Sequence, residues 1–492
     1  MERNNLRIFL LLFVCFLVVK GAKKNGIEMM FYWREVIYED LPLPDDTVIG
    51  KYPYHIPANN DVIGLAYHAK RQLMIATVGR LHPGVPSSLN AFCVNDYYVG
   101  TSPHLWAFPN YEKNTIKASF YDNTQIDSRK LHKKGEKYSS GYYNHFYEGQ
   151  ATYPAENSHN TLEDFSIISV YHPVMDEQCN RLFVIDTGNL YYGPNEIYAV
   201  QNPALIVFRI TPETTRGWNG CGSREFPVIR RVEIPNHLWT DATAFAFLTL
   251  DFQPKGSCDD LFVYITNVYD FTLTVYDYKH NSFWAFKDPS MNPIIAESSM
   301  IFSDYLHYDF PFGITNLALG RPDKEGNRNA YYGPAASTAE YAVSTNILKT
   351  PPKRTSNKNK GDFTLLGNRG CNTQVFSRTI DPHTGVIFFG ETQSKRILCW
   401  NTQYPLNPDT IGVIYESDAL QFVSEIFMDA EGYLWFHSSH LPLFLLPEIP
   451  LDITDINSRT FRVKASDAIR GTVCDVQRSY QYHVLKDVFG YK

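Results

Sequence analysis

The stretch that decides the fold is AFAFLTLDF followed, after a polar turn, by LFVYITN, within residues 244–267. Two apolar runs of strand length joined by a short polar turn are typical of paired β-strands. The pattern recurs at five other places: VIGLAYH with QLMIATVG (62–79), SIISVYH with LFVIDTG (166–188), FGITNLAL with NAYYGPA (312–335), QVFSRTI with VIFFGET (374–392) and FVSEIFMD with YLWFHSS (422–439).

This repeat predicts an all-β fold, a six-bladed β-propeller, in which each pair of runs forms the inner half of one blade. A single β-meander cannot bury both of its faces, so such units stack radially on their neighbours around an axial channel. A further strand pattern, MFYWREVIYED (30–40), is predicted to pair with TFRVKA (460–465). Strands from the two ends of the chain then share one blade and close the ring, which removes free sheet edges.

Composition and charge exclude some classes of function. The 492 residues fit one closed ring, and the 15% aromatic residues supply large side chains to pack between sheets. A formal net charge of -7 leaves no excess of cations to neutralise phosphate, so we expect no nucleic-acid partner. The motifs GxSxG, GxGxxG, P-loop and HExxH are absent, and we predict no cofactor.

The start of the chain is interpreted as a signal peptide, residues 1–21. Arg3 and Arg7 precede an apolar run over residues 8–19, and small residues follow at the spacing that a signal peptidase requires. The alternative is an uncleaved anchor, but a spanning helix needs about 20 apolar residues. We therefore predict that residues 22–492 form one secreted, extracellular propeller domain with no membrane span.

Two polar segments interrupt the predicted blades. Residues 111–160 lie between the first and second blades and have no sustained periodicity. We interpret them as a long insertion that is either mobile or functional. Its basic cluster is either solvated or in contact with an anionic matrix or membrane surface, and it consists of Lys130, Lys133, Lys134 and Lys137. Residues 349–362, KTPPKRTSNKNKGD, are predicted to form an exposed basic loop.

Cysteines remain in the predicted mature chain in an odd number, seven, once Cys15 is removed with the signal peptide. Their spacing does not match a zinc pattern, which leaves disulfides or buried thiols. We favour a bridge from Cys399 to Cys474, because Cys399 ends a strand of the fifth blade and Cys474 follows the last strand. The weaker predictions are Cys93 with Cys179 and Cys221 with Cys258, which leave Cys371 as a candidate free thiol.

The mouth of the axial channel is the predicted functional site, because the loops that enter each innermost strand meet the loops that leave each second strand there. Acid, amide and aromatic side chains at these positions suit a small aromatic amine. The alternative is that they only cap turns or fill the core. The predicted site residues are Asp186, Asn189, Thr266, Asn267, Phe312, Asn372, Glu391, Gln421 and Phe422.

Two histidines raise the question of a metal. His437 and His440 lie three residues apart after a strand of the sixth blade, but no third ligand is near them in the sequence. We interpret them as ordinary loop histidines and predict no metal site.

The segment DEQCNRLFVIDTG (176–188) resembles the ECxRLWVLDTG-type signature of the insect Yellow and major royal jelly protein family. The resemblance runs in the family's order from about residue 33 to residue 474. It includes GVPSSLN (84–90), ALIVFRI (204–210), YAVSTNIL (341–348), GVIFFGETQSKRILCWN (385–401) and IRGTVC (469–474).

The resemblance implies a secreted six-bladed propeller that acts in extracellular catecholamine and melanin chemistry, in association with cuticle pigmentation. Members convert dopachrome, bind biogenic amines such as serotonin, or serve as nutrients. Conversion of dopachrome needs a general base, for which Glu391 and Asp186 are the candidates. The alternatives are a non-catalytic amine-binding protein and a structural or storage protein.

The chain departs from the family pattern at two places. PFGITNLAL (311–319) has Phe312 where an Asp is common, and residues 157–170 lack the cysteine that commonly precedes the signature. The first departure removes an acid expected near the channel.

Overall fold

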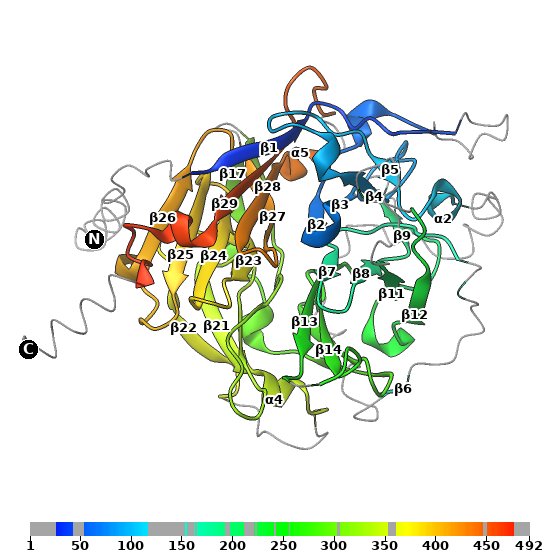
Figure 1. The fold of residues 1–492 in the computed structure, drawn as a ribbon. Helices are drawn as coiled ribbons and strands as arrows, with labels where there is room; N and C mark the ends of the chain where they lie inside the picture. Colours follow the sequence, from blue (N-terminus) through cyan, green and yellow to red (C-terminus); the bar gives the residue numbers. More distant parts are fainter. Residues whose placement is uncertain are drawn as a thin grey trace, which may run out of the picture.

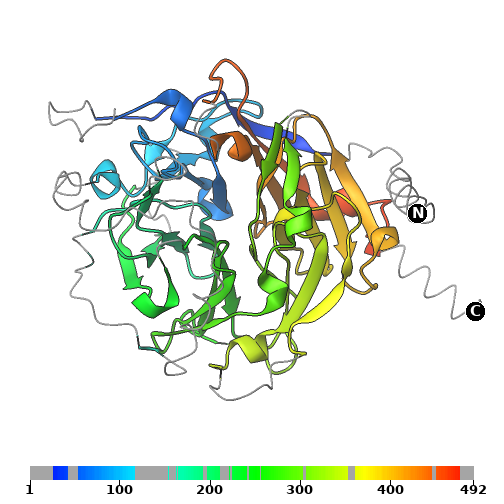
Figure 2. The same ribbon diagram turned by 180° about the vertical axis from the view of Figure 1, so that it is seen from behind.

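The computed structural model describes residues 26–42, 54–116, 153–154, 162, 165–191, 197–210, 221, 224–240, 243–254, 256–302, 306–352, 361–445 and 450–476. Six of its sheets have four or five antiparallel strands and stand around a common axis, as Figure 1 shows. Figure 2 shows the same ring from behind. The fold is a six-bladed β-propeller, which confirms the prediction from the repeat.

The blades follow the order of the chain, and the first strands contact one another between blades 1 and 2, 2 and 3, 4 and 5, 5 and 6, and 6 and 1. Their strands are β2 (Gly64–His68), β3 (Leu73–Thr77), β4 (Leu89–Cys93) and β5 (Trp106–Ala107) in blade 1; β7 (Val174–Asp176), β8 (Arg181–Asp186), β11 (Ala204–Arg209) and β12 (Val228–Glu233) in blade 2; β13 (Phe245–Phe252), β14 (Leu261–Asn267), β15 (Thr272–Asp277), β16 (Ser282–Phe286) and the edge strand β6 (Tyr153–Pro154) in blade 3; β19 (Ala318–Leu319), β20 (Asn329–Tyr332), β21 (Ala339–Ser344) and β22 (Thr364–Asn368) in blade 4; β23 (Val375–Ile380), β24 (Val386–Glu391), β25 (Arg396–Asn401) and β26 (Ile411–Glu416) in blade 5; and β27 (Phe422–Met428), β28 (Tyr433–Ser439), β29 (Ser458–Lys464) and β1 (Glu28–Trp33) in blade 6.

Smaller elements connect these strands. They are the strands β9 (Asn189–Tyr191), β10 (Ile197–Ala199), β17 (Ser299–Phe302) and β18 (Leu306–Asp309); the helices α2 (Tyr111–Asn114), α4 (Thr345–Leu348), α5 (Leu441–Phe444) and α6 (Ala465–Ile469); and the 3-10 turns η1 (Pro57–Asn59), η2 (Ala69–Arg71), η3 (Val94–Asp96), η6 (Asn236–Leu238), η7 (Pro289–Met291), η8 (Ile295–Glu297) and η10 (Pro408–Thr410). Among the described residues, no helix combines the length and the apolar character needed to cross a membrane.

The second strands of the blades are continuous apolar runs because both of their faces are covered. Every residue of β8 and of β24 is buried. Branched and aromatic residues fit such a pleated surface, and neighbouring blades pack against each face. This is why the sequence shows unbroken apolar runs in place of alternation.

Two predicted innermost strands are much shorter than the sequence pattern indicates. In residues 166–172 only one bridge forms, between Val170 and Asp186, and residues 312–319 contain only β19 and the bridge of Ile314 to Pro334. Side chains replace the missing ladder bonds. The Asp186 carboxylate accepts backbone N–H groups of residues 168 and 169, and the Thr249 hydroxyl bonds the backbone N–H and carbonyl of Leu317.

The predicted closure of the ring is confirmed. Strand β1 pairs antiparallel with β29, with Trp33 opposite Ser458. Phe31 and Trp33 are buried, and the Trp33 indole donates to the carbonyl of Pro103 at 2.8 Å. The start of the described chain therefore completes blade 6 and also packs against blade 1.

Three disulfides join described parts of the ring that are distant in sequence. The predicted bridge from Cys399 to Cys474 is confirmed, and it fastens β25 to the segment after α6. The last described segment is therefore held covalently to blade 5.

The other predicted bridges are wrong. Cys93 pairs with Cys221, and Cys179 pairs with Cys258. Cys179 and Cys258 occupy the turn between the first and second strands of blades 2 and 3, which are neighbours in space. The pairing follows these blade positions. Cys371 is disulfide-bonded, so it is not a free thiol.

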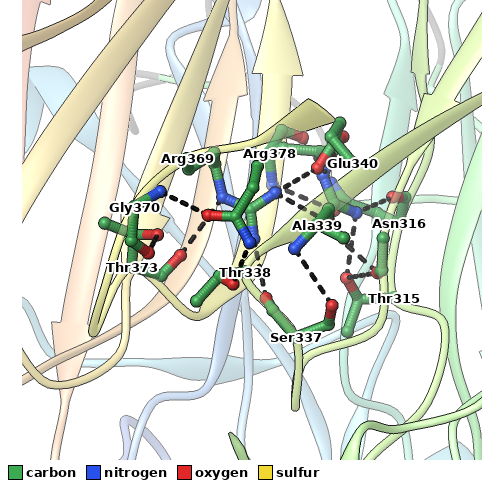
Figure 3. Close-up of polar contacts among 12 residues, drawn as sticks. Thr315, Asn316, Ser337, Thr338, Ala339, Glu340, Arg369, Gly370, Thr373 and Arg378 are labelled. Carbon is green, nitrogen blue, oxygen red and sulfur yellow. Dashed lines mark hydrogen bonds and ion pairs between the residues drawn. The ribbon is translucent and has the colours of Figure 1, made fainter. Parts of the chain in front are cut away.

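A buried ionic cluster joins blades 4 and 5, and Figure 3 shows it. Glu340 of β21 lies between Arg369 and Arg378, and the side chains of all three are fully buried. The Arg378 Nε lies 3.1 Å from Glu340 Oε1, and Arg369 donates to the other carboxylate oxygen. Backbone carbonyls and the hydroxyl of Thr315 accept hydrogen bonds from the two guanidinium groups, which buried charged groups need.

Some predicted segments lie outside the described residues. These are the signal peptide (1–21), most of the insertion at 111–160 and residues 353–360 of the basic loop.

Candidate ligand site on the propeller axis

Six side chains, one from the first strand of each blade or the residues before it, gather on the axis of the ring. Phe247 and Phe376 come from blades 3 and 5, which are not neighbours, yet their ring centroids lie 5.1 Å apart. Contacts between blades that are not adjacent place His172, Phe247 and Phe376 on the axis. Ile63, Phe312 and Phe422 belong to the same hydrophobic core. We call this set the axial cluster, and its members are Ile63, His172, Phe247, Phe312, Phe376 and Phe422.

The phenyl rings of the axial cluster contact one another in tilted and edge-to-face arrangements, which the quadrupoles of aromatic rings favour. Phe376 lies 5.1 Å from Phe422, tilted by 56°, and meets Phe247 edge to face. Phe310 adds a ring 3.8 Å from Phe312 and 5.6 Å from Phe422. The result is a continuous aromatic surface, which can stack on an aromatic ring or attract a cation.

A histidine and a glutamate supply the polar part of the axial cluster. His172 stacks on Phe247 with a centroid distance of 3.8 Å, and its Nδ1 lies 2.8 Å from Oε2 of Glu425. Glu425 belongs to β27, and its Oε1 accepts a hydrogen bond from Ser377 of β23 at 3.3 Å. Blades 2, 5 and 6 therefore meet through these three side chains.

The hairpin of β17 and β18 covers the axial cluster. Its side chains alternate: Met300 and Tyr308 are buried in the same hydrophobic core as the axial phenylalanines, while Ile301 and His307 are exposed. Phe310, which directly follows β18, packs on Phe312 and Phe422. The inner face of the hairpin is thus part of the aromatic surface.

Two predicted site residues lie in the axial cluster, Phe312 and Phe422. Two others lie beside it. Asn189 donates to the hydroxyl of Tyr191 at 3.4 Å, and Tyr191 packs against the same hydrophobic core. Asn267 accepts the backbone N–H of Tyr269, whose ring lies 4.8 Å from that of Phe312.

The structure does not place the remaining amide and hydroxyl residues of the prediction against the aromatic rings. Thr266 is buried in β14. Asn372 is an exposed turn residue with φ of 58°, and Gln421 bonds the backbone carbonyl of Asp418. Their roles in binding stay predictions.

Asp186 and Glu391, the predicted bases, have buried carboxylates with several partners. Asp186 accepts three backbone N–H groups and the amide of Gln201. Burial raises its pKa, and the backbone N–H groups lower it again. Glu391 pairs through both oxygens with Arg396, at 2.6 and 2.9 Å, while burial raises its pKa to about 7. Their catalytic role stays a prediction.

Sequence reasoning missed His172, Glu425, Phe247 and Phe376. His172 and Glu425 are 253 residues apart, so no local motif joins them. The position of these residues in the blade repeat could have identified them, because each lies at or near the first strand of its blade. Our prediction considered only the loops at the mouth of the channel and left out side chains along the innermost strands.

The fold and the axial cluster define a disulfide-bonded six-bladed β-propeller with an aromatic cluster on its axis. The chain belongs to the major royal jelly protein family, whose model, described as "Major royal jelly protein", matches residues 168–474. This confirms the family that the sequence motifs indicated.

Similar curated proteins support the same family. The Yellow-related salivary protein SP03 of Phlebotomus perniciosus is 30% identical over 95% of this chain and 99% of that protein. The Yellow-related salivary protein ASP2 of Phlebotomus orientalis is 30% identical over 95% of this chain and 100% of that protein. ASP4 of the same species is 37% identical over 63% of this chain and 75% of its own length.

Proposed function

We propose that the protein is secreted and binds a small aromatic amine or catechol compound at the axial cluster. The observation that carries this proposal is the meeting of phenyl rings from several blades beside the carboxylate of Glu425. The rings offer stacking and cation–π contact, and the carboxylate offers a partner for an ammonium group. A compound with both an aromatic ring and an amine satisfies both parts of the site.

Secretion is supported by three independent features. The apolar run at residues 8–19 follows two arginines, as in a signal peptide. Disulfides persist in oxidising compartments and are rare in the cytosol. The relatives are named salivary proteins, which fits release from a cell.

A second candidate function is conversion of a catechol-derived compound such as dopachrome in extracellular melanin or cuticle chemistry. The family resemblance and the acid–base side chain His172 in the axial cluster favour it. If Asp186 or Glu391 acts as the base, its carboxylate has to exchange the partners that hold it. Binding needs no such exchange, and we therefore place binding first.

The access of a ligand has a structural requirement. Phe422 and Phe310 are almost completely buried, and the hairpin of β17 and β18 covers them. A ligand that reaches the rings would have to displace this hairpin.

Calorimetric titration of the purified protein tests the proposal. We expect heat of binding with dopamine and none with butylamine, which has the amine but no ring. Phe376→Leu should weaken dopamine binding about five- to tenfold through loss of ring contacts, whereas Tyr98→Leu, at an exposed tyrosine, should have no effect. Absence of dopamine binding, or a Phe376→Leu protein with unchanged affinity, contradicts the proposal.

Assays on the same purified protein distinguish the other candidate functions. Faster loss of dopachrome absorbance in its presence would support conversion as well as binding. A storage or structural protein predicts neither binding nor turnover.

A further inference from the structure

The turn between the first and second strands of blade 2 contacts two other blades through one carboxylate. It comprises residues 177–180, and we call it the blade 2 turn. The Glu177 carboxylate accepts the backbone N–H of Ala69, directly after β2 of blade 1, at 2.8 Å, and that of Ala430, after β27 of blade 6, at 3.1 Å. Because blades 2 and 6 are not neighbours, the contact with Ala430 places Glu177 near the ring axis.

The blade 2 turn lies at the end of the ring opposite to the hairpin of β17 and β18. Residues 177–180, Ala69 and Ala430 follow the first strands of their blades, whereas the hairpin precedes the first strand of blade 4. The first strands of a propeller run in the same direction along the axis, so their starts and their ends lie at opposite ends of the ring. Asn180 adds a second contact with blade 1, because its Oδ1 lies 3.0 Å from Nε2 of His68. The blade 2 turn therefore holds blades 1, 2 and 6 together at this end.

A disulfide and one arginine hold the blade 2 turn to blade 3. Cys179 is bonded to Cys258, which lies in the turn between β13 and β14. Arg181 donates to the carbonyl of Cys258 and pairs with Asp259 at 3.3 Å. The Asp259 side chain is 64% exposed, so this ion pair contributes little to stability. The disulfide is therefore the strong connection between the blade 2 turn and blade 3.

The Cys179–Cys258 disulfide is accessible from solvent, unlike the other two disulfides that join described residues. Cys258 is exposed and Cys179 is half-buried. The cysteines of the other two disulfides are at most 5% exposed, and they are Cys93, Cys221, Cys399 and Cys474. Thiol–disulfide exchange needs a thiolate to reach a sulfur atom, and exposed disulfides are the labile ones. Exposure therefore favours Cys179–Cys258 for reaction with thiols.

We propose that the Cys179–Cys258 disulfide is a thiol-exchange site, and that its reduction by a dithiol releases the blade 2 turn at the end of the ring axis. The turn is then a redox-controlled latch: the disulfide keeps Glu177 on blades 1 and 6, and reduction loosens these contacts. The two buried disulfides remain closed and keep the rest of the propeller folded. This inference does not rest on the proposed binding of an amine.

The exchange proceeds in two steps, and its electrons and protons balance. A thiolate of the dithiol attacks Sγ of Cys258, the S–S bond to Cys179 breaks, and the electron pair leaves with Sγ of Cys179, which takes up a proton from water. The second thiolate of the dithiol then attacks the dithiol sulfur bound to Cys258, closes the internal disulfide of the dithiol and releases Cys258, which also takes up a proton. The dithiol loses two electrons and two protons, and the protein disulfide gains them.

Partial reduction of the native protein tests the exchange site. The protein is treated with dithiothreitol without denaturant, quenched with iodoacetamide and analysed by peptide mass spectrometry. We expect Cys179 and Cys258 to be labelled at least about tenfold faster than the four buried cysteines. The control is the same reaction in concentrated urea, where all six should react at similar rates. Labelling of the buried cysteines at the same rate in the native protein overturns the proposal.

Hydrogen exchange tests the latch. In the double variant Cys179→Ser, Cys258→Ser, the two backbone N–H groups that donate to Glu177 should exchange about tenfold faster than in the wild type, because the turn that carries their acceptor is no longer fastened. The backbone N–H of Ser169 is the internal control. It donates to Asp186 at the other end of blade 2, and its exchange should be unchanged.

Glu177→Ala is the matched variant, because it removes the acceptor and keeps the disulfide. It should speed the exchange of the same two N–H groups. If the double cysteine variant does not fold, wild-type protein that has been reduced and alkylated under native conditions takes its place.

The outcomes separate the latch from a general loss of stability. Unchanged exchange of the two N–H groups after loss of the disulfide overturns the latch. Faster exchange at Ser169 as well would mean that the whole propeller loosens, which also overturns it. Neither result bears on amine binding at the axial cluster, which the calorimetric titration tests separately.

Discussion

At the scale of single residues, the buried carboxyl of Glu391 makes folding depend on pH. Burial raises its pKa from 4.5 to about 7. Between these values the folded protein holds a proton that the unfolded chain releases. The stability contributed by this group is therefore present below pH 4.5 and is lost as pH rises through 7.

We predict that Glu391→Gln flattens this dependence. In the wild type, the contribution of Glu391 to the free energy of unfolding should fall by roughly 3 kcal/mol between pH 4.5 and pH 7, at about 1.4 kcal/mol for each pH unit. Urea unfolding at pH 5, 6 and 7 measures the slope. Asp418→Asn, at a fully solvated carboxyl, should leave it unchanged. A Glu391→Gln protein with the wild-type slope would show that another group carries the dependence.

Glu340 illustrates the opposite case, a buried carboxylate whose partners depend on it. Two guanidinium groups lie against it, and the side chains of all three are fully buried (Figure 3). Removal of the negative charge leaves Arg369 and Arg378 buried and unneutralised.

We predict that Glu340→Gln lowers the free energy of unfolding by about 3–5 kcal/mol. Asp418→Ala breaks an ion pair in which the aspartate is 96% exposed, so it should cost less than about 1 kcal/mol. Chemical denaturation of both variants measures the two losses in the free energy of unfolding. Similar losses in the two would mean that the buried cluster contributes no more than a surface pair.

At the scale of elements, the end of the described chain depends on a covalent link to blade 5. Cys399 and Cys474 are 75 residues apart, and the disulfide closes a loop that contains β27, β28 and β29, three of the four strands of blade 6. Such a cross-link stabilises mainly by restricting the unfolded chain.

We predict that replacement of both cysteines by alanine lowers the free energy of unfolding by about 4 kcal/mol, as expected for a loop of this length. Thermal and urea unfolding should both show the loss, with the β-rich circular dichroism spectrum retained at low temperature. An equally stable double variant would mean that the pairing of β1 with β29 closes the ring without help.

The elements also show where sequence patterns fail. Continuous apolar runs predicted the second strands well, since β8 and β24 are buried on both faces. The innermost runs of blades 2 and 4 look alike in sequence, but part of their backbone bonds the side chains of Asp186 and Thr249. That exchange depends on residues far along the chain, so local pattern could not reveal it.

At the scale of the whole molecule, closure of the ring brings together residues that no sequence window contains. Phe312 and Phe422 were predicted because they lie at the entries of inner strands, and they belong to the axial cluster. His172 and Glu425 were missed because they meet across the axis from blades 2 and 6. The disulfide pairing could not be predicted for the same reason, because Cys179 and Cys258 pair between neighbouring blades.

The central claim is that the axis of the propeller is the place where an aromatic amine binds. A crystal structure of the protein with dopamine tests it most directly. We expect the catechol ring among Phe247, Phe376 and Phe422. Dopamine bound only on the outer surface, with the axial rings packed as they are in the free protein, would contradict it.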